Sequence, residues 1–471
     1  MSSFFINKKP RKNGLVEVRG TGKRRKKPNE GDGKPRRKAL SQLNEEISSD
    51  SGTESPAADK RKQRHAEDEE IEETAQEKKL RLAKSYLEQL QQQEEEKAEE
   101  EAFQQDLVAS RLEEEVLEQR GKLQRLVAKD LQPPDVTKIQ VLRGHQRPIT
   151  CLVISPDDQH IFSAAKDCTI IKWDVYSGKK ICVIPRGQKG AKDQHGHTAH
   201  ILTMTISSDG KYLATGDKNK LILIWETETC RHLYTFPGHR DAVSALSFRK
   251  GTHQLYSASH DRSLKVWNVA ENAYVETLFG HQDAVMGMDS LSRERCVTAG
   301  GRDGTVRVWK IAEESQLVFH GHNGSIDCIQ LINEEHMVSG ADDGSLALWS
   351  VAKKKPLAVV KQAHGVHGDQ GLEQPYWISS VSAILNSDVV ATGSHDSNIR
   401  VWQCGEGFRS LKALFEIPLM GFINSLKFSN AGDFLVAGVG QEHRLGRWWR
   451  IKEAKNAVYI IPLKRAPPKL S

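Results

Sequence analysis

One short set of residues recurs from residue 144 onward and constrains the fold more than any other feature. Each set has a Gly-His pair, an Asp about twenty-two residues later and a Trp six residues after the Asp. Four sets are complete: Gly144-His145, Asp167 and Trp173; Gly238-His239, Asp261 and Trp267; Gly280-His281, Asp303 and Trp309; Gly321-His322, Asp343 and Trp349. Repeats of this kind predict stacked copies of one small unit that bury their apolar faces against one another.

Each repeat contains short runs rich in β-branched residues, such as "LYSAS", "LKVWNV" and "VRVWKI", separated by turn residues. Such runs predict four antiparallel strands in each repeat, and the spacing is typical of a WD-repeat β-propeller. Three weaker copies raise the count to seven: Gly196-His197 with Trp225, Asp396 with Trp402, and the stretch 422–451 with Trp448 and Trp449. We therefore predict an all-β, seven-bladed WD-repeat β-propeller over residues 138–463.

The weaker copies depart from the pattern at the His or the Asp position. The departures are Asn219 in the Asp place of the second copy, with Asp217 two residues too early; His364-Gly365 far upstream of the sixth; and Glu442 or His443 in the Asp place of the seventh. In the seventh copy we expect one of the two tryptophans to lie in the core.

The repeated polar residues are expected to form one hydrogen-bonded chain in each blade. A buried indole N–H needs an acceptor, which a Ser or Thr can supply, and an unsatisfied partner costs roughly 1 to 3 kcal/mol. The members are His145, Ser163, Asp167 and Trp173; His239, Ser257, Asp261 and Trp267; His281, Asp303 and Trp309; His322, Ser339, Asp343 and Trp349; and Thr392 in the sixth copy. We favour a structural role over a catalytic one, because the sequence contains no phosphate-binding glycine loop, nucleophile elbow or zinc-ligand spacing. We predict no enzyme, metal or cofactor.

Charge divides the chain into zones. Residues 1–65 carry 18 Lys and Arg against 8 Asp and Glu, whereas residues 66–131 carry 10 against 20. The first zone has few large apolar residues and is predicted to be a disordered basic tail. Its nuclear-targeting candidates are Lys23, Arg24, Arg25, Lys26, Lys27, Arg36, Arg37 and Lys38, and its phosphorylation candidates are Ser48, Ser49 and Ser51. A solvated tail without a targeting signal is the alternative.

The acidic zone, 66–131, is rich in helix-forming residues and lacks proline. Two apolar stripes predict amphipathic helices that dock on a partner or on the propeller flank: Leu80, Ala83, Leu87 and Leu90; and Leu112, Val116, Leu123 and Leu126. A solvated spacer helix is the alternative. A linker (132–137) with Pro133-Pro134 follows, and a tail (464–471) ends the chain.

Seven scattered cysteines without a CxxC pair, and the lack of a signal peptide or membrane-length apolar run, predict a reduced, intracellular protein. Two features of its propeller are left open. Either 139–142 or 457–463 can form the outer strand of blade seven, and insertions at 186–194 and 365–375 lengthen two loops.

A ring of cationic residues is predicted on the face formed by the turns before the tetrad Asp. In register these residues are Lys166, Lys218, His260, Arg302, Asp342 and His395, joined by Arg147 and Arg240 from the Gly-His loops. The seventh copy adds His443, Arg444, Arg447 and Arg450 beside its tryptophans. The ring suits phosphates or an acidic protein segment, although a simple preference of Lys and Arg for turns would give the same pattern.

Six segments carry a resemblance to one family: "NEEISSDS", "AQEKKLRLAKSYLEQL", "LEQRGKLQRLVAKDL", "LYSASHDRSLKVWNVAEN", "TAGGRDGTVRVWK" and "GVGQEHRLGRWWRIKEA". Together they resemble the WD-repeat family of the U3 small nucleolar ribonucleoprotein, across the acidic zone and every blade.

The resemblance implies a non-catalytic protein of the nucleus and nucleolus. It implies binding to U3 snoRNA at the box B/C element, together with a kink-turn-binding box C/D protein. It also implies a monomer within the small-subunit processome, among other processome proteins and without membrane or small-molecule substrate, that supports pre-rRNA processing for 18S rRNA. The alternative is a nuclear adaptor or substrate receptor that binds an acidic or modified peptide.

Overall fold

The computed structural model describes residues 79–81, 83–85, 87, 109–118, 120–121, 123–188, 196–368 and 373–465. The chain divides into two units, Met1–Ser85 and Tyr86–Ser471. In the first unit, residues 79–81 and 83–85 are helical and Leu80 is exposed. The nuclear-targeting clusters between Lys23 and Lys38, and Ser48, Ser49 and Ser51, lie outside the described residues.

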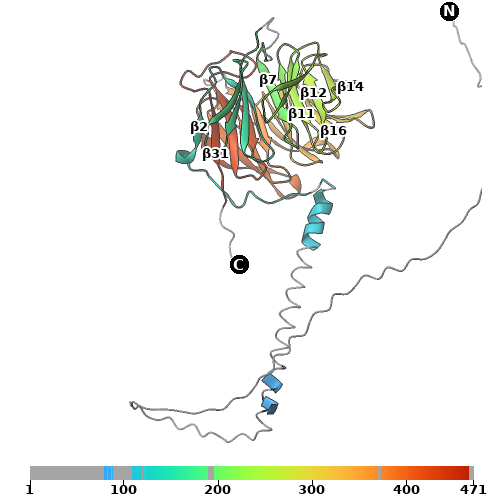
Figure 1. Cartoon of the computed structure of the whole chain (residues 1–471), viewed down its shortest axis with the longest axis vertical. Coiled ribbons are helices and arrows are strands. Elements are labelled where there is room, and N and C mark those ends of the chain that lie inside the picture. The colour runs from blue at the N-terminus through green and yellow to red at the C-terminus, as the bar shows by residue number, and fades with distance from the viewer. Residues whose placement is uncertain are drawn as a thin grey trace, which may run out of the picture. The chain divides into compact units, whose positions relative to one another are not determined.

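Seven four-stranded antiparallel sheets account for most of the described part of the second unit (Figure 1). The first strand of each sheet contacts the first strands of both neighbouring sheets, so the sheets close into a ring. The prediction of a seven-bladed β-propeller is therefore confirmed.

The strands follow one another within each blade. Blade one has β3 (Ile149–Ile154), β4 (His160–Ala165), β5 (Ile170–Asp174) and β6 (Lys180–Ile184). Blade two has β7 (Ile201–Ile206), β8 (Tyr212–Asp217), β9 (Ile222–Glu226) and β10 (His232–Phe236). Blade three has β11 (Val243–Phe248), β12 (Gln254–Ser259), β13 (Ser263–Asn268) and β14 (Ala273–Phe279). Blade four has β15 (Val285–Ser290), β16 (Arg295–Gly300), β17 (Thr305–Lys310) and β18 (Ser315–His320).

Blade five has β19 (Ile326–Leu331), β20 (His336–Ala341), β21 (Leu346–Ser350) and β22 (Lys353–Val360). Blade six has β25 (Ser380–Ala383), β26 (Val389–Gly393), β27 (Asn398–Cys404) and β28 (Leu411–Pro418). A small hairpin, β23 (Val366–His367) with β24 (Gln374–Pro375), precedes blade six within the insertion at 365–375. The 3₁₀ turns are η1 (Val136–Lys138) and η2 (Glu406–Phe408).

Blade seven closes the ring with both ends of the propeller sequence. Its strands are β29 (Phe422–Phe428), β30 (Phe434–Gly440), β31 (Ala457–Pro462) and β2 (Gln140–Leu142). Of the two candidate segments, 139–142 supplies the outer strand and 457–463 supplies the third strand. Residues more than 300 positions apart therefore pair in one sheet. Removal of either β2 or β31 would disrupt blade seven.

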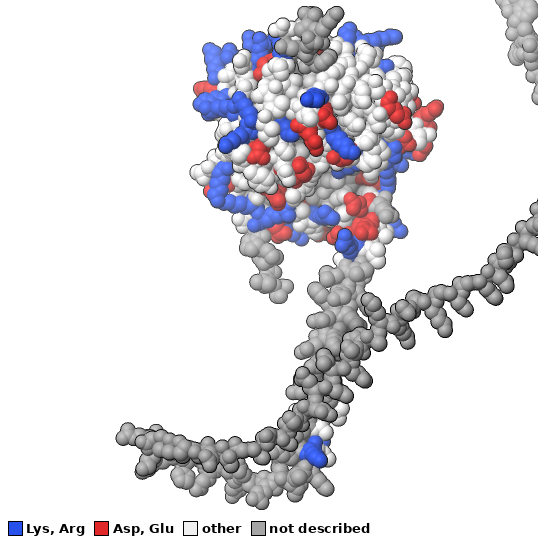
Figure 2. Space-filling model, viewed as in Figure 1, with Lys and Arg blue, Asp and Glu red and all other residues white. Residues whose placement is uncertain are grey.

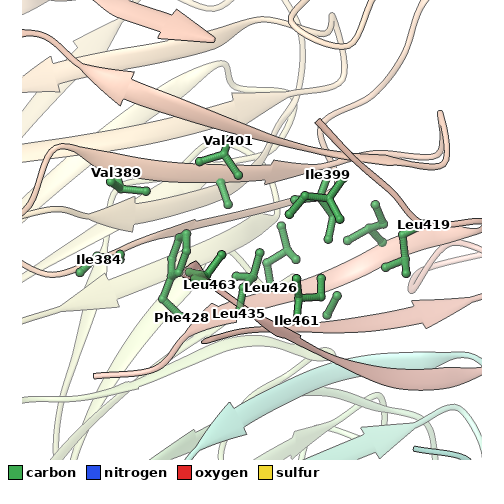
Figure 3. Close-up of a cluster of buried hydrophobic side chains, with 14 of the residues drawn as sticks. Ile384, Val389, Ile399, Val401, Leu419, Leu426, Phe428, Leu435, Ile461 and Leu463 are labelled. Atoms are coloured by element: carbon green, nitrogen blue, oxygen red, sulfur yellow. The ribbon is translucent and has the colours of Figure 1, made fainter. Parts of the chain in front are cut away.

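The apolar core lies between neighbouring blades. The first strands are largely buried, as in β3, where every residue is buried, whereas the fourth strand β6 is mostly exposed. Figure 3 shows the cluster between blades six and seven, where Val401 and Ile399 of one blade meet Leu426 and Ile461 of the next. Ala128 and Leu131 belong to this cluster although they lie before the propeller in sequence.

The acidic zone ends differently from its prediction. Residues 109–118 are helical, and the helix stops at Gly121, where φ is +71° and a Cβ atom would lie 2.8 Å from Cβ of Glu334. Glycine alone adopts this conformation readily and allows this approach. The prediction that the helix continues to Leu131 is therefore wrong, because the described residues between Gly121 and Leu131 are not helical. Of the second apolar stripe, Leu112, Val116 and Leu126 are exposed and only Leu123 is buried.

Residues 123–132 form a segment, here called the strap, that lies across turns of blades five and six. Backbone N–H groups of Val127 and Ala128 donate to Oδ1 of the buried Asp388 at 2.8 and 3.0 Å. The Gln124 amide donates to the carbonyl of Gly405 at 3.1 Å. The strap ends in β1 (Leu131–Gln132), which pairs with β32 (Lys464–Arg465). The strap thus completes the core with both apolar side chains and backbone hydrogen bonds.

Candidate nucleic-acid interface

Blades one to six each contain a polar clasp that joins a His, a Ser or Thr, and a Trp. In blade one, Nε2 of His145 lies 2.8 Å from Oγ of Ser163, and the indole of Trp173 donates to the same oxygen at 2.8 Å. Nδ1 of His145 lies 3.3 Å from Asp167. The corresponding groups of the other five are His197, Thr215, Asp217 and Trp225; His239, Ser257, Asp261 and Trp267; His281, Thr298, Asp303 and Trp309; His322, Ser339, Asp343 and Trp349; His364, Thr392, Asp396 and Trp402. In blade five, Ser345 stands between His322 and Asp343.

The clasp joins a hydroxyl, a histidine and an aspartate in the same sequence of hydrogen bonds as a hydrolase triad, but its hydroxyl is not open to a substrate. The Ser163 oxygen is fully buried and also accepts from the indole, so a substrate cannot approach it. Burial alone would raise the pKa of Asp167, but hydrogen bonds from His145 and Thr169 outweigh it and lower this pKa to about 2. The same balance lowers the pKa of Asp303 to about 2. The clasps hold the blades in a single conformation.

Two interpretations of the weaker copies are wrong. In blade two, Asp217 and not Asn219 meets His197, with 3.0 Å between Nδ1 and Oδ2, because β8 ends at Asp217 and directs its carboxylate back toward the loop. In blade six, His364 completes the clasp in spite of its distance in sequence, because the hairpin of β23 and β24 lies between it and β25 in the chain. Spacing in the sequence does not predict the clasp residue at either position, because a hydrogen bond depends on where the two side chains lie in space.

Blade seven has no such clasp among its described residues. Ala437 and Ile461 stand in register with the Ser and Trp of blade one, and both are fully buried. Trp448 and Trp449 are 68% and 52% exposed, so the expectation that one of them lies in the core is wrong. Glu442, expected in the Asp place, instead binds Lys166 and Arg447.

The predicted ring lies at one end of the propeller, here called the clasp face. The backbone N–H of Lys166 donates to the Pro148 carbonyl at 3.1 Å, and that of Lys218 donates to the His200 carbonyl at 2.9 Å. These bonds join the turn between second and third strands to the loop that enters the first strand. Arg147, Lys218, Arg240 and Arg302 are exposed on this face.

The ring is not uniformly cationic. Burial lowers the pKa of His260 below its ordinary value and that of His395 to about 4, so both are neutral near pH 7. Asp342 interrupts the ring with a carboxylate. Lys166 is buried, with its Nζ 3.4 Å from Glu442 and 3.2 Å from the carbonyl of Gly446. The prediction that His260, His395 and Lys166 offer positive charge to a ligand is therefore wrong.

Arg444 also has a different role from the one predicted. Its guanidinium donates to the carbonyl of Asp327 at 2.8 Å, on the first strand of blade five. Its backbone N–H donates to Asn424 of β29 at 3.0 Å. The side chain therefore reaches across the central channel. The Asp327 carboxyl is buried there, which raises its pKa to about 6 although the Arg444 charge opposes the shift.

Positive charge is concentrated on the clasp face of blades one and two. Burial lowers the pKa of His200, and so do the charges of Lys166, Lys218, Arg147 and Arg186 around it. We call the three exposed members of this group, Arg147, Arg186 and Lys218, the basic patch. Arg186 was missed because it begins an insertion and belongs to no repeat position. Figure 2 shows basic and acidic side chains intermixed over the face of the propeller in view.

An aromatic cluster lies on the clasp face of blades six and seven. His395 has ring centroids of Tyr376, Trp377 and Phe422 at 4.9, 5.6 and 5.4 Å. The cluster continues to His367, His443, Trp448 and Trp449. The sequence pattern indicates the two tryptophans beside arginines, but not His367 of the insertion 365–375 or Tyr376 and Trp377 just after it.

The described residues contain no group of three or more His, Cys, Asp or Glu side chains that could hold a metal ion. No helix within that part of the chain is long and apolar enough to cross a membrane.

The fold and its six clasps define a WD-repeat β-propeller, and the family model "WD domain, G-beta repeat" matches residues 136–174, 190–226, 230–268, 272–310, 313–350 and 371–403. The matches end before β29, β30 and β31, the three strands of blade seven that lie where a clasp would form. Among similar proteins is U3 small nucleolar RNA-interacting protein 2 of Mus musculus, 71% identical over 95% of this chain and 94% of that protein. Ribosomal RNA-processing protein 9 of Saccharomyces cerevisiae is 27% identical over 75% of this chain and 78% of its own.

A solved structure described as "Crystal structure of RRP9 WD40 repeats" superposes with a TM-score of 0.69 at 73% identity, covering 71% of this chain and all of that one. The chain belongs to the family of U3 small nucleolar RNA-interacting protein 2.

Proposed function

We propose that this protein is a non-catalytic component of the U3 small nucleolar ribonucleoprotein. It binds U3 snoRNA near the box B/C element beside a kink-turn-binding box C/D protein. Within the small-subunit processome of the nucleolus it supports early pre-rRNA processing for 18S rRNA. The names of its relatives, which refer to U3 small nucleolar RNA and to ribosomal RNA processing, support this role.

The basic patch is the observation that carries the proposal. Its three exposed cations act on His200 at the clasp-face end of blades one and two, where the backbone N–H of Lys218 donates to the His200 carbonyl at 2.9 Å. Positive charge gathered in this way suits consecutive phosphates. The clasp face of blades three and four lacks this concentration, because Asp241 and Asp283 accompany the arginines there. Backbone contacts of this kind fix position and register, and base pairing and other proteins give the RNA its shape.

The test compares two triple variants with the same change in charge. Arg147→Glu, Arg186→Glu and Lys218→Glu alter the basic patch. Arg240→Glu, Arg302→Glu and Arg262→Glu alter blades three and four, where all three arginines are exposed. Affinity for a U3 transcript is measured with the purified full chain at several salt concentrations.

We expect the basic-patch variant to lose roughly a hundredfold in affinity and to show a salt slope lower by about 2, since each phosphate contact on single-stranded RNA contributes about 0.7. The blade three and four variant should lose much less. Equal losses would show that only net charge matters and would remove the basic patch from the RNA site. Unchanged binding by both, with loss of a bound acidic peptide instead, would favour the peptide adaptor.

A further inference from the structure

The loop 441–456, between β30 and β31, is fixed at several points. The Gln441 N–H donates to Oδ1 of Asn456 at 3.0 Å, and the Ile451 N–H donates to the carbonyl of Gln441 at 3.0 Å. In its middle, Arg444 is anchored in the central channel. The loop therefore presents its remaining side chains from a stable base, which reduces the entropy lost on binding.

Two tryptophans at the tip of this loop face solvent. Trp448 is 68% exposed and Trp449 is 52% exposed, whereas the six clasp tryptophans are at most 4% exposed. A large exposed aromatic side chain marks a binding surface more often than it serves stability. Two adjacent ones form a surface with area for stacking.

Other rings hold these two tryptophans in place. Trp449 lies 5.2 Å from the ring of His367 and 5.7 Å from that of His395. Trp448 lies 5.9 Å from the ring of His443 and 6.3 Å from that of Trp377. The supporting rings come from two blades and the insertion 365–375, so the orientation of both indoles is determined by tertiary structure.

The charge beside the indoles comes from arginine. Burial lowers the pKa of His395 to about 4 and that of His443 to about 3, so these rings are neutral near pH 7. Arg447 precedes the tryptophans with its side chain 74% exposed, and its Nε lies 2.5 Å from Glu442. The same carboxylate lies 3.4 Å from Nζ of Lys166. Glu442 thus connects the loop to Lys166 of blade one, whose charge acts on the same His200 as the basic patch.

We propose that Trp448 and Trp449 form a stacking platform for unpaired nucleobases, with the Arg447 guanidinium on the adjacent phosphate. This inference rests on the proposed function and specifies single-stranded RNA as the ligand of this part of the clasp face. Stacking on aromatic side chains together with nearby arginine is the way proteins bind single-stranded nucleic acid without reading its sequence. The exposed Arg447 and Arg450 on either side of the two indoles favour RNA over an apolar protein segment as the occupant.

The platform is tested with the full chain carrying Trp448→Ala and Trp449→Ala, and with a matched variant carrying Trp448→Phe and Trp449→Phe. Affinity for the U3 transcript should fall about tenfold or more for each alanine. Phenylalanine should restore most of it, because it keeps a π face. Thermal unfolding should match the wild type in both variants, since the substituted side chains are exposed.

A second measurement follows tryptophan emission during titration with oligouridine. Stacking should quench emission in the wild type and in the basic-patch variant at saturation, and the effect should vanish when both loop tryptophans are replaced. A fully paired hairpin RNA should quench little.

The outcomes separate this inference from the proposed function. Normal U3 affinity in the alanine variant, with lost affinity in the basic-patch variant, would overturn the platform and leave the RNA function standing. Normal affinity in both would overturn both. Normal U3 affinity with reduced recovery of processome proteins would make the surface a protein-docking site, and the inference would be wrong.

Discussion

Blades one to six and blade seven solve the same packing problem in different ways. In the six, a buried indole, a histidine and a hydroxyl satisfy one another, whereas blade seven places Ala437 and Ile461 at the equivalent positions and relies on apolar contact. Blade seven is also the blade assembled from both ends of the propeller sequence. Without a clasp, its loop between second and third strands no longer has to return a carboxylate to a histidine. That loop is consequently free to carry two tryptophans and an arginine to the surface.

The largest expected effect contrasts two tryptophans from the two kinds of blade. Trp349→Ala, in the blade-five clasp, should lower the free energy of unfolding by about 3 to 5 kcal/mol because it removes a fully buried ring. Trp449→Ala should change it by less than about 1 kcal/mol. Urea denaturation measures both. A large loss for Trp449→Ala would mean that the loop stabilises blade seven, contrary to the division described above.

Acid should weaken the clasps. The folded-state pKa of Asp167 is about 2, below the ordinary value for an aspartate, so its contribution to stability is present above about pH 4 and is lost as the pH falls through about 2. The contribution should be about 2.5 kcal/mol. The destabilisation caused by Asp167→Asn should therefore be largest above pH 5 and nearly vanish at pH 2, as measured by denaturant unfolding at each pH. A difference independent of pH would show that the Asp167 charge does not act in the clasp.

A smaller loss of stability should follow when the hydroxyl oxygen of a clasp is removed from blade three, or when one is added at the equivalent position of blade seven. Ser257→Ala removes the oxygen that accepts from Trp267 at 2.8 Å and lies 2.7 Å from His239, at a cost of about 1.5 kcal/mol. The reverse change in blade seven, Ala437→Ser, buries a hydroxyl without an indole to satisfy it and should cost about 1 kcal/mol. Calorimetry of both proteins checks the pair. A stabilising Ala437→Ser would indicate that blade seven is a defective clasp blade and not an alternative design.

The sequence predicts the propeller well because the clasp residues recur within a narrow spacing and each has few substitutes. It predicts the weak copies poorly because a hydrogen bond depends on where a side chain lies in space. Asp217 is two residues early and His364 is separated by an insertion, yet both complete their clasps. The expectation that one of Trp448 and Trp449 lies in the core is wrong because residue type alone does not show that Ile461 already fills that position.

The sequence shows which turn positions lie on the clasp face, but not which of their side chains offer charge. Turn positions identified the exposed Lys218 and Arg302, but they could not show that Lys166 is neutralised by Glu442 or that Arg444 turns into the channel. Both partners come from another blade, at sequence separations that no local pattern contains. The aromatic cluster depends in the same way on an insertion whose residues follow no repeat.

The strap has a consequence for how the molecule is divided. The repeat pattern begins at about residue 138, but the buried carboxylate of Asp388 is satisfied by backbone groups of Val127 and Ala128. A fragment cut at the first repeat would leave this charge without two of its donors and would open an apolar seam between blades six and seven. The first residue of the repeats is thus not the first residue of the folded unit. The last residues of the acidic zone, Ala128 and Leu131, are part of the core between blades six and seven.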